Sequence, residues 1–326
     1  MKPPQFKDIF EADRLLRTHA RRTPLLESVL LNEKLDGRLL IKAEALQHTG
    51  SFKFRGAYTK ISRIDPHIRP RGVVAYSSGN HAQGVAAAAR LHGIPSVIVM
   101  PSDAPRIKIE NTRAYGAEVV LYDRYSESRE RLAENLAEQR NAILIRPYDD
   151  TDIIAGQGTV GLELATQARE LAVSVDTLLC PCGGGGLIAG CALALQTESP
   201  STEILAVEPE GFDDTARSLV AGKRLSNAED AESFCDALVV PQPGELTFAI
   251  NSRLVQGGLA VSDLQTAAAM AQAFHHFKLV VEPGGAVALA AVLSGKFAIQ
   301  GKTVVVVCSG GNVDPTLYRQ VLKKHS

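Results

Sequence analysis

The chain has 326 residues, of which 45% are hydrophobic and 22% are charged, and its formal net charge is −1. This near-neutral balance removes the electrostatic argument for nucleic acid or an anionic membrane as a partner. No apolar run approaches the roughly 18 to 20 residues that span a bilayer, and the first residues, MKPPQFKDIFEADRLL, lack the apolar core of a signal peptide. We therefore expect a cytoplasmic protein, with two domains because the length exceeds the usual range of a single core.

Short β-rich apolar runs alternate with alanine-rich helical patterns, such as NHAQGVAAAARLHG and LIAGCALALQ, through almost the whole chain. Because the apolar runs lack alternation, we expect strands that are buried on both faces, as in parallel sheets. The order of the elements therefore predicts an α/β fold of doubly wound character. The predicted strands, in chain order, are residues 72–78, 96–100, 117–122, 142–147, 176–182, 203–209 and 302–311.

The predicted strands fall into two groups, one within residues 72–147 and one after residue 176. We expect the first group to form the sheet of a small domain, residues 66–149. The large domain then comprises residues 1–65 and 150–326, and it ends in a short helix at TLYRQVLKKHS. No low-complexity linker separates the two groups, so the domains are expected to pack closely.

The cysteines contain no CxxC pair, so neither zinc binding nor redox chemistry is indicated. We expect plain buried thiols, because buried cysteine behaves as a small hydrophobic residue. The cysteines are Cys180, Cys182, Cys191, Cys235 and Cys308.

Lys53 lies between two phenylalanines in the segment HTGSFKFRGAY, residues 48–58. Apolar surroundings lower the pKa of a lysine, so part of the amine is uncharged near neutral pH. An uncharged amine can condense with an aldehyde. Lys53 is therefore a candidate for the covalent attachment of an aldehyde cofactor.

Two loops at strand-to-helix junctions offer sites for anions. In CGGGGLIAG, four consecutive glycines leave backbone amides bare at the positive end of a helix, which is typical of a phosphate cradle. In SSGNHAQG, the side chains of Ser77, Ser78, Asn80 and His81 crowd around a helix start, which suits a carboxylate.

A third loop, VVVVCSGGNVD, carries Ser309 directly after a buried strand. Ligands of open parallel sheets bind beyond the carboxyl ends of the strands, so the three loops can converge on one site. A cofactor with both an aldehyde and a phosphate would engage Lys53 and the glycine loop together, which indicates pyridoxal 5′-phosphate (PLP). The glycines also fit a degenerate G-x-G-x-x-A pattern with Glu208 at a suitable distance, so a Rossmann dinucleotide-binding protein is the alternative. That alternative leaves Lys53 and the serine-rich loop without a role.

Six motifs occur in the order expected of the fold type II PLP enzymes, namely SFKFRGA, SSGNHAQGVA, IAGQGT, CGGGGLIAG, EPGGAVALAAVL and CSGGNVD. Across nearly its whole length the sequence resembles this family, and within it the branch of threonine and serine dehydratases and serine racemases. The resemblance implies a tryptophan synthase beta-like fold, with two doubly wound domains and the cofactor in the cleft between them. It also implies a homodimer.

The activity that the resemblance implies is that of a PLP-dependent carbon–nitrogen lyase. Such an enzyme converts L-threonine or L-serine to a 2-oxo acid and ammonia by β-elimination. A serine racemase, or a dehydratase specialised for hydroxyaspartate or phenylserine, is an alternative. The residues Ala237, Val239 and Val240 depart from the usual pattern and leave the substrate open, whereas the intact Lys53 argues against a non-catalytic cofactor carrier.

The resemblance also implies residue roles. Lys53 is the Schiff-base lysine that removes the α-proton, and Ser78 is the residue that acts on the opposite face in racemases. A hydroxyl at Ser309, unlike a carboxylate, cannot stabilise a protonated ring nitrogen, which suits rapid loss of a β-leaving group. The implied cofactor-binding positions are Phe52, Lys53, Asn80, Gly183, Gly184, Gly185, Gly186, Leu187, Glu282 and Ser309. The implied substrate-binding positions are Ser77, Ser78, His81 and Arg129.

The segment AVEPEGFDD resembles the one in which this branch binds Mg²⁺ or Ca²⁺. The matching ligands are the carboxylates of Glu208 and Asp214 and the main-chain carbonyl of Phe212. Oxygen ligands of this kind suit hard cations. The resemblance therefore implies a metal site in addition to the PLP site.

Overall fold

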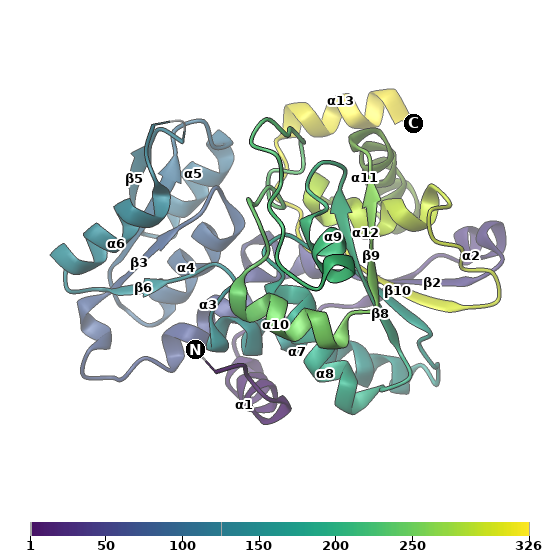
Figure 1. Cartoon of the computed structure of the whole chain (residues 1–326), viewed down its shortest axis with the longest axis horizontal. Coiled ribbons are helices and arrows are strands. Elements are labelled where there is room, and N and C mark those ends of the chain that lie inside the picture. Colours follow the sequence, from purple (N-terminus) through teal and green to yellow (C-terminus); the bar gives the residue numbers. More distant parts are fainter. Residues whose placement is uncertain (1, 125, 326) are drawn as a thin grey trace.

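The computed structural model describes residues 2–124 and 126–325, and it contains two separate β-sheets that lie side by side (Figure 1). The larger sheet has six strands in the order β1-β2-β10-β7-β8-β9, and only β1 runs antiparallel to its neighbour. The smaller sheet has four parallel strands in the order β5-β4-β3-β6. The strands are β1 (Leu25–Glu27), β2 (Arg38–Lys42), β3 (Val73–Tyr76), β4 (Ser96–Pro101), β5 (Glu118–Tyr122), β6 (Ile143–Ile145), β7 (Thr177–Pro181), β8 (Glu203–Pro209), β9 (Gly257–Val261) and β10 (Thr303–Val307).

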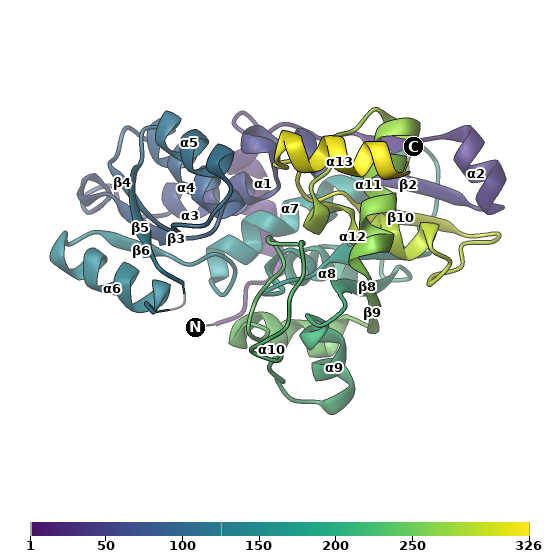
Figure 2. The same cartoon turned by 90° about the horizontal axis from the view of Figure 1, so that it is seen from above.

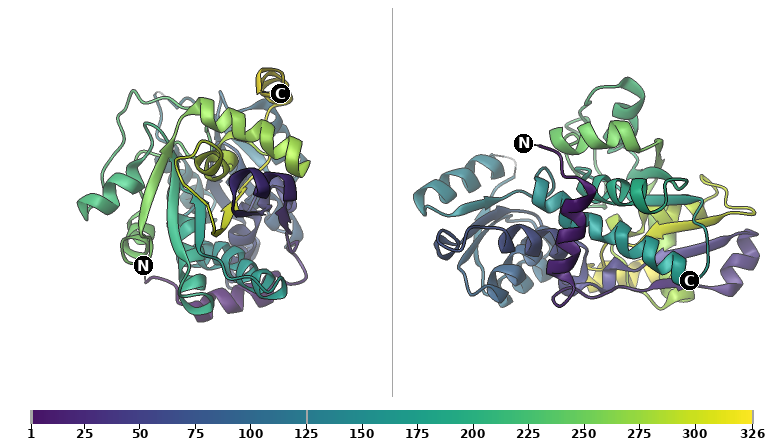
Figure 3. Two further views of the ribbon diagram at one scale, coloured as in Figure 1. Left: turned by 90° about the vertical axis from the view of Figure 1, so that its right-hand side faces the viewer. Right: turned by 90° about the horizontal axis from the view of Figure 1, so that it is seen from below.

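Helices connect most of the parallel strands, because parallel pairing requires a crossover connection between successive strands. They are α1 (Phe6–Leu16), α2 (Val29–Leu35), α3 (Lys53–Ser62), α4 (Asn80–Leu91), α5 (Arg106–Ala114), α6 (Arg129–Gln139), α7 (Thr151–Glu170), α8 (Gly186–Glu198), α9 (Asp214–Ala221), α10 (Glu245–Leu254), α11 (Asp263–Phe277), α12 (Pro283–Leu293) and α13 (Pro315–His325). Short 3₁₀ turns lie at Glu44–Leu46, His48–Gly50 and Arg69–Arg71. Seen from below, α1 lies along the underside of the molecule, where it packs against α7 and α3 (Figure 3).

Both faces of the small sheet are covered, because its strands bury alternate side chains in two different cores. Val73 and Ala75 of β3 pack in the core that contains α3 and α4, whereas Val74 and Tyr76 pack in the core that contains Ala133 of α6. Figure 2 shows α4 and α6 on opposite sides of this sheet. The continuous apolar run therefore reflects burial on both faces.

The large sheet is built in the same way. In β10, Val304 and Val306 pack with α11 and α12, whereas Val305 and Val307 pack with α7 and α8. The predicted α/β class with two doubly wound sheets is thus confirmed. Among the described residues, no helix combines the length and apolar character that a membrane crossing requires. All five cysteines are free and buried, as expected.

All seven predicted strands are present, with ends that differ by at most four residues, but three strands escaped prediction. These are β1 and β2, which extend the large sheet with residues from near the N-terminus, and the glycine-containing β9. The domain boundaries stay a prediction. Helix α3 packs both on α4, beside the small sheet, and on α7, beside the large sheet.

Candidate active site

A single cavity between the two sheets collects the three predicted loops and Lys53. The loops follow the carboxyl ends of β3, β7 and β10, as the parallel topology requires. Most of the candidate residues line this cavity. They are Phe52, Lys53, Ser77, Ser78, Asn80, His81, Arg129, Gly183, Gly184, Gly185, Gly186, Leu187 and Ser309. Glu282 lies directly behind Asn80, to which it is hydrogen-bonded.

Lys53 is the first residue of α3, and its side chain is half-buried. Its Nζ donates a hydrogen bond to the carbonyl oxygen of Pro147 at 2.8 Å and lies 5.2 Å from the centre of the Phe52 ring. Burial lowers the pKa of Lys53 to about 8. Near pH 7, about a tenth of the amine is therefore uncharged and able to react with an aldehyde.

Two carbonyl groups of the glycine loop before α8 are hydrogen-bonded to residues of α10 that do not line the cavity. The carbonyl of Gly184 accepts a hydrogen bond from Thr247 Oγ1 at 2.6 Å, and that of Gly185 accepts one from Asn251 Nδ2 at 3.4 Å, both from α10. In a trans peptide the next N–H points the opposite way, so the amides that follow these carbonyls are directed away from α10. Together with the free amides of the first turn of α8, they form an anion cradle.

Glycine is required in this loop for two separate reasons. Gly185 has a φ of 87°, a left-handed conformation that glycine adopts without strain. A Cβ at Gly184 would overlap the ring of Tyr148, which lies across the loop. Glycine at these two positions therefore allows both the turn and the close approach of Tyr148.

The loop between β3 and α4 is preorganised by its own hydrogen bonds. Gly79 N–H donates to Ser77 Oγ at 3.0 Å, and His81 Nε2 lies 3.1 Å from the carbonyl of Ile145. Burial, with a smaller contribution from Lys53, lowers the pKa of His81 to about 3, so the ring is neutral. A proton on Nε2 satisfies Ile145 and leaves the buried Nδ1 without a partner. The ring can therefore only accept a hydrogen bond at Nδ1, and it offers no positive charge to an anion.

Sequence reasoning missed two charged residues that line the cavity, Lys108 and Asp236. Lys108 of α5 lines the cavity, and its Nζ lies 2.8 Å from Asp236 Oδ2 and 3.2 Å from Glu282 Oε2. The other oxygen of Glu282 accepts a hydrogen bond from Asn80 Nδ2. The only sequence signal for Lys108 is its place on the face of α5 that also buries Ile109 and Thr112.

The remaining walls of the cavity differ in polarity. Arg129, at the start of α6, pairs through Nε with Glu130 at 2.8 Å, and its guanidinium lies 5.7 Å from the centre of the Tyr76 ring. Tyr148 lines the cavity beside them. Another part of the lining is apolar and consists of Ala237, Leu238, Val239 and Val240. The cavity therefore offers both a cation and a hydrocarbon surface.

The predicted metal ligands lie outside this cavity, at the end of β8. Both oxygens of Glu208 accept hydrogen bonds from backbone amides of α9, at 3.0 Å from Thr215 and 2.8 Å from Ala216. Asp214 Oδ1 accepts from Asn227 at 2.6 Å, whereas Asp214 Oδ2 is buried without a partner. Among the described residues, no group of three or more His, Cys, Asp or Glu side chains is arranged so that it could hold a metal ion.

The fold and the cavity together define an enzyme that holds a phosphate-bearing aldehyde cofactor between two α/β domains. The sequence pattern of the family described as pyridoxal-phosphate dependent enzyme matches residues 16–310, and the chain belongs to this family. It is 42% identical over 323 residues to an L-threo-3-hydroxyaspartate ammonia-lyase of a Pseudomonas species, covering 99% of this chain and 100% of that one. It is 40% identical to an L-threonine ammonia-lyase of Thermotoga maritima, covering 98% of this chain and 78% of that one.

Solved structures agree with this assignment. The chain matches the structure of maize serine racemase with a TM-score of 0.92 and 39% sequence identity, covering 99% of this chain and 98% of that one. The resemblance to fold type II PLP enzymes is confirmed, and the Rossmann alternative is set aside.

Proposed function

We propose that this protein is a PLP-dependent ammonia-lyase of 3-hydroxy-α-amino acids, which converts L-threonine or L-serine to a 2-oxo acid and ammonia. The observation that carries the proposal is a lysine with a pKa of about 8 in the same cavity as a glycine anion cradle. These two features fit the aldehyde and the phosphate of one cofactor.

When bound, PLP supplies a conjugated ring that makes the α-proton of an attached amino acid acidic. We assign to Lys53 the holding of the cofactor and the acceptance of that proton, because it is the cavity amine that loses its own proton most readily. Ser77 and the free amides of the first turn of α4 would hold the α-carboxylate. Ser309, which lines the same cavity, would offer a neutral hydroxyl to the ring nitrogen.

A racemase activity is the second candidate, and Ser78 supports it. Its side chain lines the same cavity as Lys53, so a second group that could exchange a proton with the α-carbon is available. Maize serine racemase is also among the similar structures. Incubation with L-serine, followed by chiral analysis of the remaining serine, separates racemisation from elimination.

The identity of the 3-hydroxy amino acid depends on two walls of the cavity. Val239 and Val240 suit the methyl group of threonine, or the ring of phenylserine. Arg129 suits the second carboxylate of 3-hydroxyaspartate, the substrate named for the Pseudomonas relative. A panel of these amino acids and serine, with detection of ammonia and the 2-oxo acid, distinguishes them.

We further propose that Mg²⁺ or Ca²⁺ binds to Glu208, Asp214 and the carbonyl of Phe212. In the absence of a cation, burial and the charge of Asp214 raise the pKa of Glu208 to about 8, and burial raises that of Asp214 to about 6. A divalent cation would relieve this destabilisation and give Asp214 Oδ2 a partner. Chelation should lower the melting temperature and Mg²⁺ or Ca²⁺ should restore it; an unchanged melting temperature would contradict the site.

Finally, we propose a cytoplasmic homodimer. Support comes from two adjacent apolar side chains on α2, Val29 and Leu30, which are 68% and 73% exposed. Contiguous exposed apolar surface, rather than a single exposed apolar side chain, marks protein interfaces. Sedimentation of the wild type and of Leu30→Lys tests the dimer, which the lysine should weaken.

The decisive experiment compares wild type with Lys53→Ala in the presence of PLP. Wild type should show the visible absorbance of a lysine-bound cofactor and should form a 2-oxo acid and ammonia. The variant should show neither. Full activity in the Lys53→Ala variant would overturn the proposal.

A further inference from the structure

Lys108 is a buried lysine that connects the small-sheet side of the cavity to the large-sheet side. It projects from α5 and is only 2% exposed. Its aliphatic stem lies against Gly79, where a Cβ would overlap its Cδ. Its Nζ reaches Asp236 at 2.8 Å and Glu282 at 3.2 Å. Contacts from three segments, one to the stem and two to the ammonium, therefore hold Lys108 at the wall of the cavity.

Glu282 is bonded both to Lys108 and to Asn80, and Asn80 lines the cavity. One oxygen of Glu282 faces Lys108, and the other accepts from Asn80 Nδ2. The oxygen of the Asn80 amide accepts from Asn312 Nδ2 at 2.8 Å, and Asn312 Nδ2 also donates to the carbonyl of Thr49 at 2.7 Å. Both ends of the Asn80 amide are therefore held, and its orientation is determined.

The charge on Glu282 depends on Lys108. Burial raises the pKa of Glu282 and Asp236 raises it further, whereas Lys108 opposes both. Burial disfavours the charge on Lys108, but Glu282 and Asp236 outweigh it and raise its pKa. The groups that face Glu282 are therefore one cation, one anion and one amide. Without the cation, Glu282 would be a buried carboxyl beside a second carboxylate, and it would take up a proton.

The ion pair with Asp236 also links Lys108 to the apolar wall of the cavity. Asp236 precedes Ala237, Leu238, Val239 and Val240, the apolar wall of the cavity. The ion pair with Lys108 therefore ties this wall, which belongs to the large-sheet side, to α5 on the small-sheet side.

We propose that Lys108 is a positioning residue that keeps Glu282 ionised and thereby fixes the Asn80 amide in the cofactor cleft. This role rests on the proposed function, because the group that Asn80 meets in the cleft is PLP. A charge-assisted hydrogen bond from Asn80 to an ionised Glu282 is stronger than one to a neutral carboxyl. Loss of the Lys108 charge should loosen Asn80 without removing any residue that touches the substrate α-carbon.

The test measures the dissociation constant of PLP by equilibrium dialysis, and kcat/KM, as functions of pH. Lys108→Met should raise the dissociation constant of PLP and lower kcat/KM, each by about tenfold or more near neutral pH. This is the effect of one lost charge-assisted hydrogen bond. Glu282 then ionises only at higher pH, so the ratio of variant to wild type should recover towards one as the pH rises, and the pH dependence that Lys53 gives to both proteins cancels in this ratio. The double variant Lys108→Met/Glu282→Gln should show no such recovery.

Lys60 provides a matched control. Its Nζ also contacts two carboxylates, Asp150 at 2.9 Å and Asp152 at 3.1 Å, but it lies away from the cavity. Lys60→Met should lower the melting temperature and leave the pH profile unchanged. Lys108→Arg, which keeps the charge, should restore part of the binding.

The outcomes separate this role from the proposed function. If wild type binds no PLP, both are overturned. If wild type binds PLP and Lys108→Met differs only by a pH-independent factor or a lower melting temperature, the role of Lys108 alone is overturned. Should Lys108→Met not fold, Glu282→Gln replaces it, because it preserves the side-chain shape; it must weaken PLP binding, or the proposal fails.

Discussion

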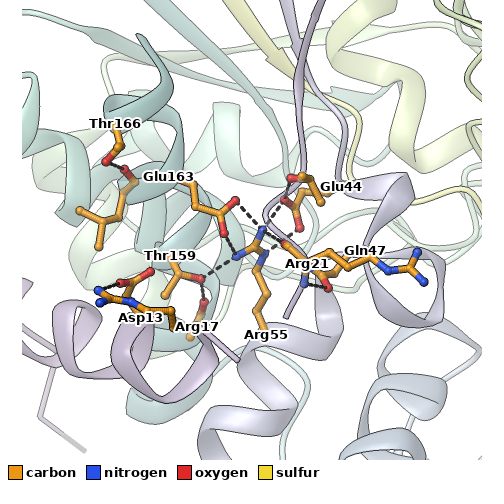
Figure 4. Close-up of polar contacts among 12 residues, drawn as sticks. Asp13, Arg17, Arg21, Glu44, Gln47, Arg55, Thr159, Glu163 and Thr166 are labelled. Atoms are coloured by element: carbon orange, nitrogen blue, oxygen red, sulfur yellow. Dashed lines mark hydrogen bonds and ion pairs between the residues drawn. The ribbon is translucent and has the colours of Figure 1, made fainter. Parts of the chain in front are cut away.

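Replacing Glu163 with glutamine should destabilise the protein strongly, because this side chain neutralises two buried cations at once. Glu163 of α7 lies 2.7 Å from Lys42 Nζ and 2.8 Å from Arg55 Nη1. Arg55 also pairs with Glu44 at 2.8 Å, and Figure 4 shows its guanidinium between the two carboxylates. Lys42, Arg55 and Glu44 are essentially inaccessible to solvent. In the variant, two buried cations share one carboxylate.

The magnitude follows from the burial of these partners. Breaking a buried ion pair by removing one partner costs about 3 to 5 kcal/mol. Unfolding entropy near ~2.1 cal/mol/K per residue gives about 0.7 kcal/mol/K for a chain of 326 residues. The melting temperature should therefore fall by about 4 to 7 °C.

The pH dependence adds an independent check. Burial lowers the pKa of Lys42 below its unfolded value, and loss of Glu163, which opposes this effect, lowers it further. Between the folded and unfolded pKa values the unfolded state binds more protons, so stability rises with pH in this window. The deficit of Glu163→Gln relative to wild type should shrink as the pH approaches about 10.

Urea denaturation at several pH values measures this deficit. Glu170→Gln is the control, because Glu170 pairs with Arg22 at 2.6 Å but both side chains are about half exposed. That exposed pair should contribute at most about 1 kcal/mol. Equal losses in the two variants, or a Glu163→Gln deficit that grows with pH, would refute the reasoning.

Three further predictions concern the cavity. Gly184→Ala should weaken PLP binding by more than about tenfold in equilibrium dialysis, because its Cβ would overlap Tyr148. Gly257→Ala is the control, because the atom nearest to its added Cβ would lie 3.6 Å away. The rate at which the PLP-free protein acquires the cofactor absorbance should rise with pH and level off above about 8, because the amine of Lys53 is uncharged above its pKa; a pH-independent rate would contradict this. Arg129→Met should lower kcat/KM for 3-hydroxyaspartate by about tenfold to a hundredfold, since a charged hydrogen bond is lost, and should leave threonine largely unaffected.

The sequence was sufficient for the parts of the fold that depend on local pattern. Continuous apolar runs such as that of β10 predict buried parallel strands, because both faces of such a sheet are covered. The glycine loop before α8 could be predicted for a related reason. Parallel strands present their carboxyl ends at one edge, so three loops with unusual composition had to meet.

The missed features depend on contacts between distant segments. Strand β2 contains Lys42, whose charge argues against a buried strand until Glu163, far along the chain, is brought beside it. Lys108 resembles a surface lysine in the sequence, because its partners Asp236 and Glu282 follow more than a hundred residues later. A buried charge is identified only with its partner, and the partner is known only from the fold.

The two sheets contribute different chemistry to the cavity, and this division bears on substrate choice. The glycine loop and Ser309 come from the large-sheet side, whereas Ser77, Ser78 and Arg129 come from the small-sheet side. The groups assigned to the cofactor are thus mainly on one side and those assigned to the substrate on the other. Lys108 reaches from one side to the other and pairs with Asp236 next to the apolar wall, so this ion pair links the wall proposed to contact the β-substituent to the side that carries the loop proposed to bind the α-carboxylate. Changes at Val239 or Arg129 should therefore alter which substrate is accepted, whereas changes at Lys108 should lower the turnover of all of them.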